Sequence, residues 1–96
     1  MSKGYVYILS NPTMPGLVKI GKTTREVNAR ALELYQTGVP APFKVEHQVL
    51  TPDCHILELK LHERLRAQRL DPGREFFRCS VASAAQELDE LRTVQF

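Results

Sequence analysis

The chain has 96 residues, of which 43% are hydrophobic, so it can bury one modest core and is expected to form a single domain over residues 1–96. No apolar run is long enough to cross a membrane, and residues 1–4 lack the apolar stretch of a secretory signal. The net charge of +2 permits a nucleic-acid partner without requiring one, and two widely spaced cysteines suit neither a zinc cluster nor a disulfide scaffold. We therefore expect a cytoplasmic protein with reduced thiols.

The first predicted elements are two strands joined by a turn. Residues 5–9 (YVYIL) are aromatic and branched-apolar, which favours a strand, and residues 17–20 (LVKI) form a second one. The connection between them, residues 11–16 (NPTMPG), is dense in turn-forming residues. A connection this short suits antiparallel neighbours, so the two strands are expected to pair as a hairpin.

A helix is predicted next. Thr23 and Glu26 fit the spacing of a capping box, which places the start of the helix at Thr23. The apolar positions that follow keep the spacing of a buried helical stripe: Val27, Ala31, Leu34 and Tyr35. Gly38 precedes a proline-rich segment, so the helix is expected to end near it.

The remaining elements alternate between strands and helices. Residues 43–50 predict a third strand, and the following helix is expected to start with Thr51 as its cap and to run to about Leu70. Residues 75–78 (EFFR) indicate a short fourth strand, and Ser80 caps a last helix. The predicted order is β-β-α-β-α-β-α. Because it starts with a hairpin, the fold class is α+β, with a small antiparallel or mixed sheet flanked by about three helices.

Residues 16–23 (GLVKIGKT) match the expression of a phosphate-binding loop, G-x-x-x-x-G-K-[ST]. In such a loop the residues between the glycines form a wide turn whose amides surround the phosphates. Here those residues are a strand sequence, and the chain is too short for the parallel sheet that such a site requires. We therefore interpret the segment as a strand that leads into a helix.

Ionisable side chains on the hairpin indicate a catalytic surface. In an extended strand Lys19 points away from Val18 and Ile20, and Tyr5 and Tyr7 share one face of the paired strand. A lysine beside a phenol favours the phenolate and lowers the phenol pKa from its ordinary value of about 10. A tyrosine tuned in this way would serve as a general base.

Glu58 is the most informative carboxylate of the chain. It falls at the edge of the apolar arc of the second helix, which consists of Cys54, Leu57, Leu61 and Leu65. Glu58 is either a border carboxylate paired with an arginine or a ligand of a hard cation such as Mg²⁺, which prefers oxygen ligands. His62 lies one helical turn later on the same side.

Basic residues form two groups along the chain. The first contains Lys19, Lys22, Arg25 and Arg30, and the second contains Arg64, Arg66, Arg69, Arg74 and Arg78. Both groups are either solvated surface charge or contacts to a DNA backbone, which they would attract without reading its sequence. Arg30 flanks the apolar stripe of its helix, where a guanidinium can bind a phosphate through two donors.

Taken together, these segments resemble the GIY-YIG nuclease superfamily. The hairpin GYVYILSNPTMPGLVKIG is most similar to the branch found in bacterial and phage open reading frames, with a variant "VY…KIG" motif. The resemblance extends from Gly4 to about Phe77 and includes Arg30, the segment ELKLHERL and the segment REFF. It implies a DNA endonuclease that hydrolyses phosphodiester bonds with one divalent ion, Mg²⁺ or Mn²⁺.

The resemblance also implies a role for each matched residue. Tyr7 stands at the tyrosine of the first motif and implies a general base or a hydrogen-bonding partner of the attacking water. Arg30 would steady the scissile phosphate, and Glu58 would hold the metal. The expected site comprises Tyr7, Lys19, Lys22, Arg30 and His62 as catalytic residues, Glu58 as the metal ligand, and Tyr5, Gly21, Arg25 and Arg74 as substrate contacts.

The chain departs from the superfamily pattern at several positions. Lys19 replaces the tyrosine of the second motif, Leu34 stands where some relatives carry a histidine, and the segment REFF lacks their late asparagine. The base therefore stays open between Tyr7, tuned by Lys19 or Lys22, and His62. A catalytically degenerate DNA-binding or protein-interaction domain of the same fold is the alternative, and a homodimer is compatible with cutting both strands.

Overall fold

The structure is a computed structural model and describes residues 2–95. Its elements are β1 (Gly4–Ser10), β2 (Leu17–Thr23), α1 (Val27–Leu34), β3 (Lys44–Thr51), α2 (Cys54–Arg64), the 3-10 helix η1 (Arg66–Gln68), β4 (Phe76–Arg78) and α3 (Val81–Gln95). The strands form one antiparallel sheet in the order β3-β1-β2-β4. The predicted α+β class and the order of elements are confirmed, and the sheet is antiparallel throughout.

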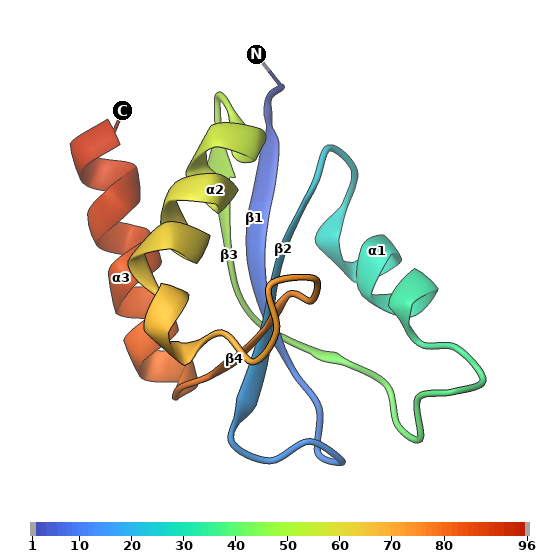
Figure 1. The fold of residues 1–96 in the computed structure, drawn as a ribbon. Coiled ribbons are helices and arrows are strands. Elements are labelled where there is room, and N and C mark those ends of the chain that lie inside the picture. Colours follow the sequence, from blue (N-terminus) through green and yellow to red (C-terminus); the bar gives the residue numbers. More distant parts are fainter. Residues whose placement is uncertain (1, 96) are drawn as a thin grey trace.

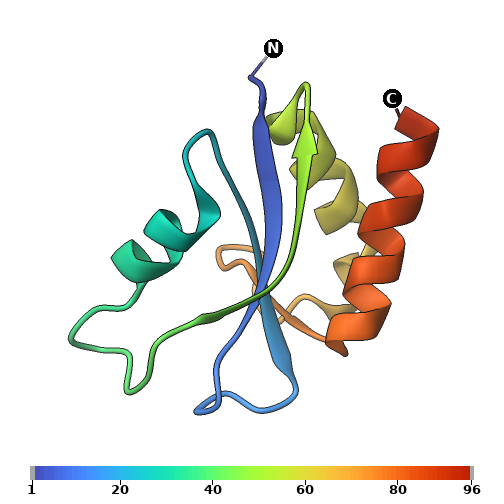
Figure 2. The ribbon, with the colours of Figure 1, turned by 180° about the vertical axis from the view of Figure 1, so that it is seen from behind.

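The alternation of side chains along β1 divides the sheet into two faces. Val6 and Ile8 belong to the larger core, under α2 and α3, whereas Tyr7 and Leu9 face α1. Figures 1 and 2 show α2 and α3 together on one side of the sheet and α1 alone on the other.

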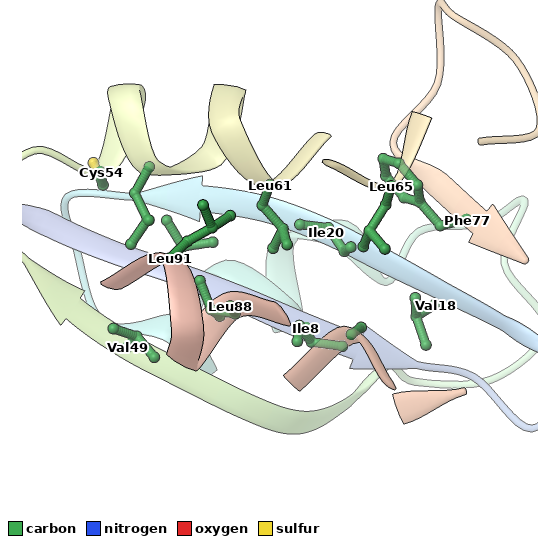
Figure 3. Close-up of a cluster of buried hydrophobic side chains, with 13 residues drawn as sticks. Ile8, Val18, Ile20, Val49, Cys54, Leu61, Leu65, Phe77, Leu88 and Leu91 are labelled. Carbon is green, nitrogen blue, oxygen red and sulfur yellow. The ribbon is translucent and has the colours of Figure 1, made fainter. Parts of the chain in front are cut away.

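The larger core joins both helices to the sheet. Figure 3 shows Leu61 of α2 and Leu88 of α3 directed toward Ile8 and Ile20 of the strands, and all four side chains are 0% exposed. Each fully buried aliphatic side chain of this kind contributes about 1.5–3 kcal/mol to folding. This packing fixes α2 and α3 against the same face of the sheet.

The start of α1 differs from the prediction. Thr23 is the last residue of β2 and pairs with Tyr5, and its Oγ1 accepts a hydrogen bond from the backbone N–H two residues later at 3.1 Å. The helix begins at Val27 after Glu26, whose side chain makes no capping hydrogen bond in the described chain. The capping-box prediction is wrong because pairing in the sheet overrides the local helix signal at Thr23. The helix also ends earlier than predicted, at Leu34.

The bounds of α2 also differ from the prediction. Asp53 caps the helix, since its carboxylate accepts a hydrogen bond from the Ile56 N–H at 3.2 Å. Thr51, the predicted cap, is buried at the end of β3 opposite Gly4. The helix stops at Arg64, where η1 takes over, so the predicted end near residue 70 is too late.

The last helix agrees with the prediction. Ser80 caps α3, because its Oγ accepts a hydrogen bond from the Ser83 N–H at 3.0 Å. Cys79, just before this cap, and Cys54 at the start of α2 are free thiols. Neither α3 nor any other helix within residues 2–95 is long and apolar enough to cross a membrane.

Candidate active site

The candidate site lies at an edge of the sheet that β4 leaves open. β4 pairs only with Leu17–Lys19, and the ladder ends where the Ile20 N–H donates to the Glu75 carbonyl at 3.0 Å. Within the described residues, no strand pairs with this edge of β2 beyond Ile20. Figure 1 shows this part of the hairpin with α1 on one side and α2 on the other.

Tyr7 is the buried centre of the site. Its side chain is 1% exposed, and its ring lies across Gly21, which is its direct partner in the register of β1 and β2. A Cβ atom at Gly21 would lie 2.7 Å from Cζ of the tyrosine ring and closer still to the phenol oxygen. Gly21 therefore makes room for the phenol, which explains a glycine here without any contact to substrate.

The pKa of the Tyr7 phenol is shifted in the direction opposite to the prediction. Burial raises the pKa of the Tyr7 phenol above its ordinary value of 10.0, and the nearby Glu75 and Glu58 carboxylates add to the rise. The Arg30 guanidinium acts in the opposite direction but does not reverse it. The expectation of a pKa lowered by a lysine is therefore wrong for this structure, and the phenol is neutral at neutral pH.

Lys19 is paired away from the phenol. It lies on the same face of the sheet as Tyr7, as predicted, because Gly21 opposes Tyr7 and Lys19 is two positions away on the same strand. Its Nζ is 3.6 Å from the Glu75 carboxylate and 5.0 Å from the centre of the Phe76 ring. Glu75 was missed as a site residue, because the sequence marks it only as part of a short predicted strand.

Glu58 reaches the open edge from α2. It is 5% exposed, and its Oε1 accepts a hydrogen bond from Lys22 Nζ at 3.3 Å. Its partner is thus a lysine of β2 and not one of the arginines. The second carboxylate oxygen, Oε2, is buried and has no hydrogen-bond partner among the described residues. A buried oxygen without a partner is costly, so this atom is available as a ligand for a cation.

The donor set around Glu58 fits one type of metal. Among residues 2–95 there is no group of three or more histidine, cysteine, aspartate or glutamate side chains that could hold an ion. Glu58 would therefore be the single anionic ligand. Mg²⁺ tolerates such a site, because it keeps several waters and commonly binds through one carboxylate plus substrate phosphate. A closed zinc site, which needs four protein ligands, does not fit.

Two arginines border the site, Arg25 on the connection between β2 and α1 and Arg30 within α1. Arg30 is half-exposed and lies beside Tyr7, since each group shifts the pKa of the other. A pocket of about 390 Å³ opens next to it and is lined in part by Lys22, Arg25 and His55. This pocket is positively charged and is wide enough for a phosphate group.

A sequence model of the T5orf172 domain matches residues 4–92. The chain belongs to the T5orf172 family. This family is related to the GIY-YIG domains, so the resemblance is confirmed at the level of the superfamily. No curated protein sequence and no solved structure matches the chain significantly.

His62 has a structural environment in this T5orf172 domain. It is 9% exposed, its Nε2 is 3.0 Å from the Ile20 carbonyl oxygen, and its ring centre is 5.1 Å from that of Phe77. Because a carbonyl only accepts hydrogen bonds, Nε2 carries the proton and donates it. His62 thus ties α2 to the end of the β4–β2 ladder, and we do not propose it as the base.

Two predicted substrate contacts lie outside this group of side chains. Tyr5 is half-buried and packs against the small cluster under α1. Arg74 is exposed on the loop before β4, where its carbonyl accepts a hydrogen bond from Arg69 Nε at 2.8 Å. The described contacts pair Lys22 of β2 with Glu58 of α2, and Arg30 of α1 with Tyr7 of β1.

Proposed function

We propose that this T5orf172 domain is a cytoplasmic, divalent-metal-dependent endonuclease that hydrolyses phosphodiester bonds in DNA. The observation that carries the proposal is the unpartnered Oε2 of the buried Glu58 carboxylate. A core retains such an atom at a cost in stability, and a cation that binds there removes the cost. The neighbouring Lys22, Arg30 and Tyr7 supply the groups that a phosphodiester requires.

Glu58 would hold Mg²⁺ or Mn²⁺, with waters and a phosphate oxygen in the other positions. The bound ion would polarise the phosphate and stabilise the leaving oxygen. Arg30 binds the non-bridging oxygens and, with Lys22, stabilises the negative charge that develops on the phosphate. The neutral phenol of Tyr7 would orient the attacking water, since its oxygen accepts a hydrogen bond, and the proton that this water loses would pass to bulk solvent. The raised pKa of Tyr7 favours this role over that of a phenolate base.

The alternative is a DNA-binding domain without catalysis. Lys19, which stands at the tyrosine position of the second motif, is paired with Glu75, and Tyr7 keeps its proton. Both observations leave the domain without an activated base. The positively charged pocket beside Arg30 would still bind a DNA backbone.

Cleavage assays separate the two functions. Purified protein is incubated with supercoiled, linear and branched DNA in Mg²⁺, in Mn²⁺ and in EDTA. Wild-type protein should cut only with metal, and Glu58→Gln should lower the rate at least about 100-fold, as expected for an electrostatic stabiliser. Tyr7→Phe should lower it by about 10²-fold, as expected when the attacking water loses its orientation. The control is Glu63→Gln on the same helix, since the side chain of Glu63 is 68% exposed and should not affect the rate.

Metal binding is measured separately, without DNA. Mn²⁺ added to the protein and followed by electron paramagnetic resonance should bind wild type and Glu63→Gln but not Glu58→Gln. Cleavage or Mn²⁺ binding that survives Glu58→Gln would show that the metal ligand is misassigned. DNA binding without cleavage in either metal would favour the alternative function.

A further inference from the structure

Glu33 of α1 bridges two arginines at the mouth of the candidate site. Its carboxylate accepts hydrogen bonds from Arg25 Nη1 at 2.6 Å and from Arg25 Nη2 at 2.8 Å. Its Oε1 also accepts one from Arg30 Nη1 at 3.2 Å. These bonds hold the pKa of Glu33 at about 2, so the carboxylate stays ionised near neutral pH.

The two guanidiniums differ in how many of their nitrogens bind Glu33. Arg25 uses both of its terminal nitrogens on Glu33, which occupies the end of the fork that would otherwise bind a phosphate. Arg30 uses only Nη1 on Glu33, so its Nη2 side remains for other partners. Arg25 is therefore better placed to anchor Glu33 than to contact DNA directly.

Arg30 is restrained from two directions. Glu33 holds it from the same helix, and the Tyr7 phenol lies beside it on β1. An isolated surface ion pair restrains a side chain weakly. A carboxylate shared by two guanidiniums, one of them bidentate, restricts all three side chains together.

We propose that Glu33, anchored by Arg25, is a positioning residue that directs Arg30 toward Tyr7 and the scissile phosphate. The phosphate as the ligand of Arg30 rests on the proposed nuclease function, whereas the restraint on Arg30 does not. Glu33 should therefore affect DNA affinity and the cleavage rate in opposite directions. A negative charge beside the DNA path weakens attraction to the backbone, but the position that it gives Arg30 speeds the reaction.

The matched variants are Glu33→Ala and Glu26→Ala. Both remove one negative charge from the α1 region, but Glu26 is exposed and makes no capping hydrogen bond in the described chain. Binding to a short labelled duplex is measured in EDTA, and the single-turnover cleavage rate is measured in Mg²⁺. Both variants should bind DNA as tightly as wild type or a few-fold more tightly. Only Glu33→Ala should cleave more slowly, by about 10- to 100-fold.

A second measurement does not depend on activity. The heteronuclear NOE of the Arg30 Nε–H, assigned with Arg30→Lys, reports how ordered the guanidinium is. It should be high in wild type and Glu26→Ala, and it should fall in Glu33→Ala. Equal NOE values in wild type and Glu33→Ala would overturn the positioning role, as would equal cleavage rates in the two alanine variants. If wild type cleaves no DNA, the nuclease function fails, and the NOE alone decides the role of Glu33.

Discussion

The contact between Gly21 and Tyr7 leads to the sharpest prediction on stability. Replacing Gly21 with alanine adds a Cβ atom 2.7 Å from Cζ and 2.9 Å from Cε1 of the Tyr7 ring. Ordinary contacts between carbon atoms are about 3.5–4.0 Å, so the ring must move by roughly 0.5–1 Å. Tyr7 is 1% exposed and cannot swing away without disturbing the cluster under α1.

The size of the effect follows from two opposing terms. Forcing one extra methyl group into a packed site costs about 1–3 kcal/mol. Removing a glycine from a strand returns about 0.5–1 kcal/mol, because the unfolded chain becomes less flexible. Gly21→Ala should therefore lower the free energy of unfolding by about 1 kcal/mol and should displace the phenol from the site. Gly38→Ala is the control, because nothing lies within 4 Å of the added Cβ. It should leave stability unchanged or raise it by up to about 1 kcal/mol.

Urea unfolding followed by far-ultraviolet circular dichroism measures both variants. The two should differ by about 1–3 kcal/mol, which is the overpacking cost alone. In a Tyr7→Leu background the ring is absent, so Gly21→Ala should no longer destabilise the domain. The reasoning is refuted if Gly21→Ala is as stable as Gly38→Ala, or if the cost of Gly21→Ala persists when the ring has been removed.

Three further predictions concern ionisation, capping and DNA binding. Because the folded state holds the Tyr7 proton more tightly than the unfolded chain does, its contribution is complete below pH 10.0 and is lost as the pH rises through the folded-state pKa. As the pH rises above 10.0, wild type should therefore lose stability more steeply than Tyr7→Phe in urea titrations. Equal slopes for the two proteins would contradict the raised pKa. Asp53→Ala removes the cap of α2 and should cost about 0.5–2 kcal/mol, whereas Glu26→Ala should stay within about 0.5 kcal/mol in the same assay. Arg30→Ala should reduce the slope of log affinity for DNA against log salt concentration by about 1, and an unchanged slope would mean that Arg30 contacts no phosphate.

Local patterns in the sequence predicted most of the fold. The hairpin, the third and fourth strands and the cap at Ser80 depend on alternation, turn residues and side-chain hydrogen bonds between near neighbours. Predictions were wrong where a residue had two competing uses. Thr23 and Thr51 are good helix caps by residue type, but both belong to strands, because their backbones pair with β1.

The candidate site was only partly predictable. The superfamily resemblance marks Tyr7, Arg30 and Glu58 in the sequence, and their roles stay predictions. Glu75 and Glu33 are not marked, because their importance depends on which cations they meet. Glu75 meets a lysine from β2, across a long stretch of chain, and no local pattern signals that contact.

The sequence by itself determined the fold class, the order of elements and the family, since these depend on residue types and their spacing along the chain. Only the tertiary structure decided the state of the charged groups. Glu58 meets Lys22 across 36 positions of sequence, and one of its oxygens is left without a partner among the described residues. Burial of Tyr7 likewise outweighs the nearby arginine and raises the phenol pKa. The physical reason is that ionisation depends on desolvation and on neighbours in space, and folding sets both.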